Sequence, residues 1–229
     1  MSGFIVGICV GASIGAMVYF AKLSLSKNRR PAASRSSRKA SKGILRADSV
    51  GEGRKIPLGS HVNIGDVIYH VEGCDQHFET DGGQISFDDY WWVYTLTDIA
   101  TNKTLYLCVV LDDEDRWEFW VYEDIKDQLW GLEQFSKLQF DNKSKRPPKS
   151  FSFRKIDWKV KKDCFDYVSH VKSERVDRSR VSKYRTRETE YQQYLPGGRK
   201  GNKTLCIEFW DGGINASTGQ KYQGPIRLT

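Results

Sequence analysis

An acidic run is the first candidate for chemistry in this sequence. "LDDEDRW" places Asp112, Asp113, Glu114 and Asp115 next to one another. Clustered carboxylates can hold a hard cation through their oxygen atoms, but this run lacks the loop length and the distal glutamate of a calcium-binding motif. We therefore interpret it as a solvated turn between two strands, whose charge keeps a strand edge from pairing with other chains.

Histidine is the second candidate. The four histidines are His61, His70, His77 and His170, and a histidine beside acidic residues can act as a general base. His70 and His77 would approach each other if "EGCDQ" formed a hairpin. The chain lacks metalloprotease spacing, a nucleophile-elbow serine and a phosphate-binding loop. The sequence therefore favours a non-enzymatic protein, and we predict no catalytic residue, no metal ligand and no cofactor.

The five cysteines, at positions 9, 74, 108, 164 and 206, share no short spacing such as C-x-x-C. Disulfide frameworks and zinc sites usually show such spacing. We expect reduced cysteines that are mostly buried, as in a cytosolic domain.

The N-terminal segment, residues 1–24, is predicted to be a transmembrane helix. Residues 3–21 carry no charge and as a helix would span about 28 Å, close to the thickness of a bilayer core. No basic residue precedes them, which favours a retained anchor over a cleaved signal peptide. Basic residues begin at Lys22, so the positive-inside rule predicts a single-pass protein with residues 22–229 in the cytoplasm.

Four glycines recur within this segment, at Gly3, Gly7, Gly11 and Gly15. On a helix, a spacing of four residues makes one smooth strip that lets a second helix approach closely. Glycine is also common in membrane helices for other reasons. Helix packing or self-association through these glycines is thus one hypothesis beside a simple anchor.

Residues 25–55 are predicted to be a flexible basic linker. Residues 22–55 carry a net charge of +9, whereas the remainder of the chain is slightly acidic. Beside a membrane helix, such a segment is expected to lie on anionic lipid. Nuclear targeting or RNA contact is the alternative for a basic run of this kind.

Residues 56–229 alternate in the manner of β-strands. In "RWEFWVYED", Trp117, Phe119 and Val121 share one face while Trp120 and Tyr122 share the other. Similar runs recur at the spacing of an antiparallel meander, and only "EDIKDQLWGLEQF" has helical periodicity. We predict a mainly β domain, either an antiparallel barrel or a two-sheet sandwich.

Charge divides this domain into two halves. Residues 56–142 have a net charge of −14 and residues 143–229 have a net charge of +12. Each half alone would repel itself, so we expect the two to dock on each other, within one chain or between chains. A nucleic-acid-binding role for the basic half would fail if the acidic half covers it.

Several short motifs of this domain resemble a bacterial domain of unknown function, family 4178. The resemblance covers most of residues 56–226 and implies a β fold without implying any chemistry. The acidic residue of the family's "L-x-V-E" strand is missing here, where the sequence is "LCVVLDD". The motifs are Gly65-Asp66, Val71-Glu72-Gly73, Trp91 to Leu96, Leu107 to Asp113, and Ile207-Glu208 with Trp210.

Adjacent tryptophans suggest a binding surface. Trp91 and Trp92 must point to opposite faces of a strand, so one of them lies outside the core unless both faces are covered. We predict a protein interface at Trp92 and Trp120, because exposed tryptophan often anchors interfaces. The sequence thus favours a membrane-anchored β-domain that binds a protein partner or assembles with itself; the alternatives are a nucleic-acid-binding module and a ligand-sensing or hydrolytic barrel.

Overall fold

The computed structural model describes residues 5–9, 17–21, 43–81, 84–112, 114–136, 147–160, 167–177, 180–199, 201–210 and 213–229. The described part is mainly β structure with three short helices, which confirms the mainly β part of the predicted fold class. Beyond the N-terminal segment, the strands are β3 (Gly43–Leu45), β4 (His61–Ile64), β5 (Val67–Asp81), β6 (Gln84–Asp98), β7 (Thr104–Leu111), β8 (Trp117–Asp124), β9 (Ser150–Phe153), β10 (Ile156–Val160), β11 (Tyr167–Asp177), β12 (Arg180–Pro196), β13 (Lys203–Trp210), β14 (Gly213–Tyr222) and β15 (Ile226–Leu228). The helices are α1 (Ala47–Gly51), α2 (Lys126–Trp130) and α3 (Glu133–Ser136).

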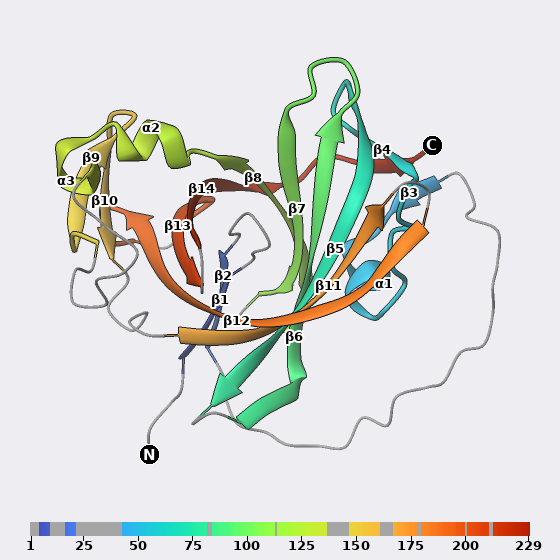
Figure 1. The fold of residues 1–229 in the computed structure, drawn as a ribbon, viewed down its shortest axis with the longest axis horizontal. Helices are drawn as coiled ribbons and strands as arrows, with labels where there is room; N and C mark the ends of the chain where they lie inside the picture. Colours follow the sequence, from blue (N-terminus) through green and yellow to red (C-terminus); the bar gives the residue numbers. More distant parts are fainter. Residues whose placement is uncertain are drawn as a thin grey trace.

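These strands form one large antiparallel sheet, which curls strongly (Figure 1). Its order is β3-β15-β4-β5-β6-β7-β8-β14-β13-β12-β10-β9, and β11 pairs with both β12 and β5. The sheet is therefore not the two-sheet sandwich that was one of our two expectations.

The sheet is not a closed barrel either, because the two neighbours of β12 pair with different parts of its length and leave one side of its first part without a paired strand. Residues 180–191 of β12 pair with β11, whereas residues 190–194 pair with β13. The two pairings overlap only at Glu190 and Tyr191. Among the described residues, the first part of β12 thus has a paired strand on one side only.

The acidic and basic halves meet along three strand pairs, one of which is the short pair of β4 with β15. Residues 73–79 of β5 pair with β11, and residues 119–124 of β8 pair with β14. Ion pairs cross between the halves: Lys221 contacts Glu118, and Arg154 Nη1 lies 3.2 Å from Glu123 Oε2. The expectation that the two halves dock on each other is confirmed within this one chain.

Further elements cover the outer face of the curled sheet in two places. Residues 43–58, with α1 and β3, pack with β4 and β15 on the face of β5–β8 that carries Trp92, Tyr94 and Phe119. Farther along the sheet, α2, α3, β9 and β10 cover the same face on β12–β14, where it carries Tyr194 and Ile207. The predicted division of β8 is confirmed, because Phe119 lies in the first cluster while Trp120 and Tyr122 lie on the opposite face.

The helix expected over residues 3–21 is not shown. Of that segment the structure describes β1 (Ile5–Cys9) and β2 (Met17–Ala21), which pair antiparallel. The described part of the chain contains no helix long and apolar enough to cross a membrane. Glycine in a helix is less favourable than alanine by about 1 kcal/mol, so a segment with four glycines needs other stabilisation to be helical. The membrane helix stays a prediction.

Gly219 is a tight point in the pairing of β8 with β14, and its replacement tests this contact. A Cβ atom there would lie 2.1 Å from a ring carbon of the fully buried Tyr122. We expect Gly219→Ala to destabilise the domain by about 1–3 kcal/mol, and to lower its melting temperature by about 2–4 °C per kcal/mol. Thermal unfolding of the full chain in mild detergent, followed by tryptophan fluorescence, measures this.

The matched control is Gly201→Ala, because a Cβ atom at Gly201 meets nothing within 4 Å. An unchanged melting temperature for Gly219→Ala would contradict the packing of Tyr122 described here.

Candidate functional site

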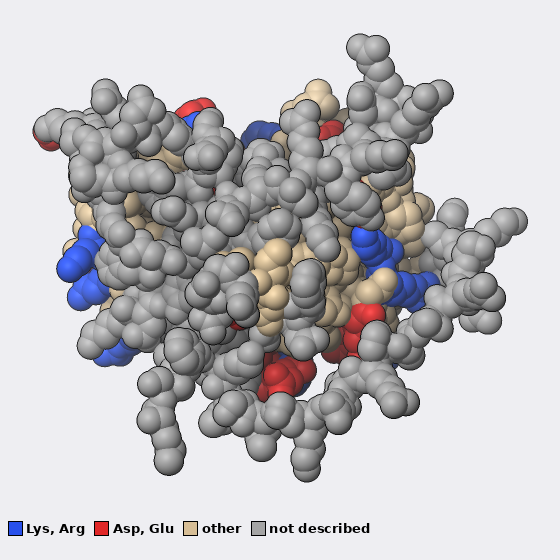
Figure 2. Space-filling model, turned by 60° about the horizontal axis from the view of Figure 1, so that its bottom comes forward, with Lys and Arg blue, Asp and Glu red and all other residues tan. Residues whose placement is uncertain are grey.

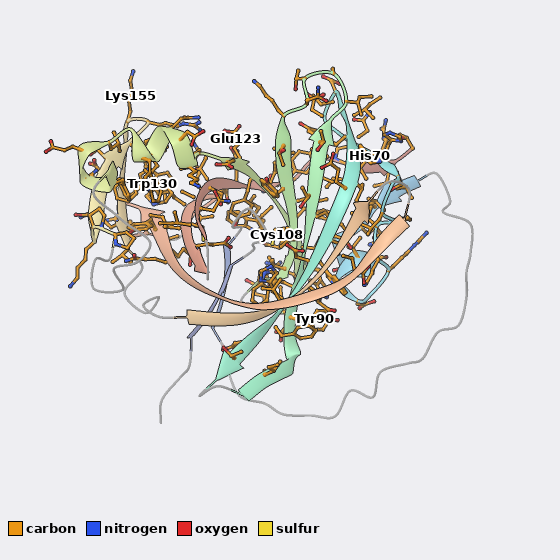
Figure 3. All side chains as sticks on the ribbon, in the orientation of Figure 1. His70, Tyr90, Cys108, Glu123, Trp130 and Lys155 are labelled. Atoms are coloured by element: carbon orange, nitrogen blue, oxygen red, sulfur yellow. The ribbon has the colours of Figure 1, made fainter. Side chains whose placement is uncertain are left out.

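The candidate site is the inner face of the curled sheet. Residues directly opposite on antiparallel strands share a face, and the register carries this face from β5 across to β13. His77 lies opposite Trp91, Cys108 opposite Trp120, and Tyr122 opposite Gly219. Figure 3 places Cys108 near the centre of the curl.

Seven buried polar or charged side chains gather on this inner face. They come from both halves of the sequence, so the site exists only in the assembled sheet. Each is at most 3% exposed. We name them the inner polar set: Asp75 and His77 on β5, Gln193 on β12, Thr204 and Glu208 on β13, and Asn215 and Ser217 on β14.

An aromatic cluster lies on the same face beside the polar set. The ring of His77 stacks on the indole of Trp91, with ring centroids 4.8 Å apart and planes at 23°. This stack fixes the orientation of the imidazole. The cluster consists of Trp91, Val93, Tyr106, Cys108, Val110, Trp120 and Tyr122.

Two polar groups of this face are buried without a hydrogen-bond partner. The Nε1 of Trp91 and the Oγ of Ser217 have none in the part of the chain that the structure describes, although both side chains are fully buried. Each such group costs about 1–3 kcal/mol relative to a satisfied one. Native proteins usually satisfy buried polar groups with protein, water or ligand.

Thr204 shows the contrasting, satisfied arrangement on the same face. Its Oγ1 accepts a hydrogen bond from Gln193 Nε2 at 3.0 Å and donates one to the carbonyl oxygen of Tyr194 at 3.3 Å. The amide nitrogen of Gln192 also lacks a partner among the described residues, but Gln192 pairs with Ile207 and belongs to the opposite face.

A charged pair lies on the same face beside the aromatic cluster. Trp120 Nε1 donates a hydrogen bond to Glu118 Oε2 at 3.2 Å, and the ammonium of Lys221 pairs with the other carboxylate oxygen. Trp120 is thereby held by both an apolar cluster and a carboxylate. Strands β1 and β2 lie close to β5, β7, β11, β12 and β13 (Figure 1).

Trp92 and Trp120 do not form the exposed interface that the sequence predicted. Trp92 is 4% exposed and packs under α1, where its Nε1 lies 3.4 Å from the carbonyl oxygen of Gly51. Trp120 is 9% exposed in the inner aromatic cluster. The prediction was wrong on exposure because α1 covers Trp92 on the outer face and the curl of the sheet encloses Trp120 on the inner face.

The histidines do not converge. His70 and His77 lie on the continuous strand β5, seven positions and therefore about 23 Å apart, so the expected hairpin at "EGCDQ" is wrong. His61 and His70 are cross-strand neighbours with ring centroids 5.3 Å apart. The side chain of His170 lies outside the described residues.

The acidic run forms a turn, as predicted. The carboxylate of Asp112 accepts hydrogen bonds from the backbone N–H groups of Glu114 and Arg116, and it pairs with the Arg116 guanidinium at 2.8 Å. Partial burial acts to raise the pKa of Asp112, but these hydrogen bonds outweigh it and the pKa lies below its ordinary value. No group of three metal-ligating side chains occurs among the described residues.

The predicted helix-packing glycines are mostly outside the described residues. Gly7 lies in β1 opposite Tyr19, while Gly3, Gly11 and Gly15 are not described. Packing of helices through these glycines therefore stays a prediction.

Comparison with known proteins gives no relative for this chain: no family model, no curated protein and no solved structure matches it. The resemblance to the bacterial domain of unknown function therefore depends on the short motifs alone.

Three described cysteines are buried free thiols, Cys74, Cys108 and Cys206, as the sequence predicted. Burial raises the pKa of Cys74 from 9.0 to about 12, and raises that of Cys108 well above its ordinary value. We expect neither thiol to react with iodoacetamide in the folded protein at about pH 8, because only the thiolate is nucleophilic. Pulsed alkylation with peptide mass spectrometry measures this.

The raised pKa of Cys74 makes the free energy of unfolding depend on pH. The unfolded chain loses the Cys74 proton near pH 9.0 and the folded chain near pH 12, so this contribution to the free energy of unfolding falls as pH rises through that range. Rapid alkylation of Cys74 in the native protein would contradict its burial.

Proposed function

We propose that this chain is a non-catalytic, membrane-tethered ligand-binding protein, in which the inner face of the sheet receives a small molecule. The single observation that supports this is a pair of fully buried groups, Trp91 Nε1 and Ser217 Oγ, that have no hydrogen-bond partner among the described residues. A ligand that hydrogen-bonds to either group offsets a cost of about 1–3 kcal/mol that the protein bears without it.

The chemistry of the face restricts the ligand. An indole N–H can only donate, so the ligand needs an acceptor such as a carbonyl or carboxylate near Trp91. The hydroxyl of Ser217 can donate or accept. The aromatic cluster supplies apolar contact area. The ligand class is thus a small molecule with an apolar or aromatic body and at least one hydrogen-bond acceptor.

The membrane tether is supported by the sequence of residues 3–21 and by the basic residues that follow. In this arrangement residues 22–229 are cytoplasmic. Lipid contacts the helix and the basic linker. The four glycines pair the helices of two or more chains, which makes a homo-oligomer.

Binding of a protein partner or of nucleic acid has less support. Trp92 and Trp120, which were to anchor a partner, are buried. The basic half pairs with the acidic half along β5–β11 and β8–β14. On the face drawn in Figure 2, Lys and Arg side chains of the described residues lie beside Asp and Glu side chains, whereas nucleic-acid binding favours a patch of one sign.

Ser217→Ala and Thr204→Val form a matched test of the proposed site. Both remove a buried hydroxyl from the inner face, but only Thr204 has hydrogen-bond partners among the described residues. We expect Thr204→Val to destabilise the domain by about 1–3 kcal/mol, and Ser217→Ala to leave stability unchanged or raise it. Thermal unfolding of the full chain in detergent measures both.

Ligand binding is measured on the same variants. Native mass spectrometry of protein purified from its own membranes in mild detergent should show a bound small molecule, with its retention reduced about tenfold in Ser217→Ala. If Ser217→Ala lowers the melting temperature as much as Thr204→Val does, the hydroxyl has a protein partner and the proposal loses its support.

A further inference from the structure

The exposed large hydrophobic side chains of the described residues gather at one end of the sheet. They are Ile44, Ile68 and Ile99, with exposed fractions of 63%, 38% and 54%. Together with the two residues between them, Asn63 and Arg227, we name them the isoleucine face. Scattered exposed apolar residues need no explanation, whereas an exposed cluster marks an interaction surface.

The strand register shows that Ile44 and Ile68 lie in one row across the sheet. Ile44 on β3 lies opposite Arg227 on β15, Arg227 lies opposite Asn63 on β4, and Asn63 lies opposite Ile68 on β5. The row therefore spans three strand spacings, about 14 Å. The backbone N–H of Ile99 donates to the carbonyl oxygen of Ile68 at 3.2 Å, which places the β6–β7 turn beside the row.

The chain enters the domain at this face, because residues 43–55 of the predicted linker 25–55 belong to the folded part, with β3 and α1. Strand β3 begins at Gly43, directly after residues 22–42, which contain eight Lys or Arg and no Asp or Glu. A flexible chain of these 21 residues has a root-mean-square length of about 25 Å. The β3 end is therefore the part of the domain that the tether holds closest to its anchor.

Side chains of both charges surround the isoleucine face, and its cations are exposed and can contact an anionic surface. Arg227 lies within the row and Lys103 lies in the adjoining turn, and both are exposed. Asp98 is engaged in its own turn, where its carboxylate accepts hydrogen bonds from Ala100 and Thr101. Asp66, in the β4–β5 turn, is exposed.

We propose that the isoleucine face docks on the anionic bilayer surface next to the anchor, an inference that depends on the membrane tether proposed above. The isoleucine side chains enter the boundary between headgroups and acyl chains, as apolar residues of peripheral proteins do. Arg227, Lys103 and the basic linker contact the lipid phosphates, which favours anionic over neutral lipid. The occupant is thus a lipid surface and not a protein.

Hydrogen exchange on the full chain in vesicles tests the docking. The protein is reconstituted into vesicles of phosphatidylcholine alone, and into vesicles that also contain phosphatidylglycerol. We expect amide exchange in residues 97–103 to slow by about tenfold in the anionic vesicles relative to the neutral ones. Ile99→Asp should abolish this difference while leaving the melting temperature unchanged, because the side chain is exposed.

Lys155→Asp is the matched control, because it changes charge at an exposed turn far from the isoleucine face (Figure 3). It should retain the slowed exchange. Equal exchange of residues 97–103 in both kinds of vesicle would overturn the docking proposal. Slowed exchange that also appears in detergent and increases with protein concentration would overturn it too, since the face would then contact a second copy of the chain.

Flotation of the vesicles separates this proposal from the tether on which it depends. If the protein stays with the vesicles after an alkaline carbonate wash but shows no slowed exchange, docking is wrong and the tether stands. If the wash removes the protein, the tether itself is wrong and the docking proposal falls with it.

Discussion

The fold depends on the backbone pairing between two chain segments of opposite charge. Strands β5 and β8 come from the acidic half, and they pair with β11 and β14 of the basic half. Neither half alone carries the complete inner face, because Asp75 and His77 come from one half and Glu208 and Ser217 come from the other. Charge neutralisation across these pairs removes the self-repulsion that each half would have alone.

Curling of the sheet has a cost that defines the candidate site. Antiparallel sheets commonly leave one face to water, where alternate polar residues are solvated. Here α1, α2, α3 and the β9–β10 hairpin all pack on the outer face of the curled sheet, while the inner face is enclosed by the curl itself, with β1 and β2 close to its strands. The polar residues of the inner face therefore lose water and need partners. Thr204 finds one in Gln193, whereas Ser217 finds none among the described residues.

The sequence predicted much of the β structure, and local physics explains both the success and the failures. Alternation in "RWEFWVYED" assigned Phe119 and Trp120 to opposite faces, because period-two patterning depends only on neighbouring residues. Part of the inner polar set shows the same period-two alternation, because Asn215 and Ser217 alternate with the apolar residues Ile214 and Ala216. That pattern is also typical of a solvated face, and only long-range pairing decides between the two. Trp92 was placed at a surface for the same reason.

The position of β15 has a consequence for synthesis of the protein. This three-residue strand lies between β3 and β4, yet it follows all the other described strands in the chain. While the ribosome still holds the C-terminal residues, β3 and β4 cannot make their native pairs with it, and the apolar cluster around Val62 and Ile226 stays incomplete. Contacts across so many residues form slowly, and their late formation leaves strand edges open to aggregation. The emergence of β15 from the ribosome is therefore the step at which this domain can first close its own edge.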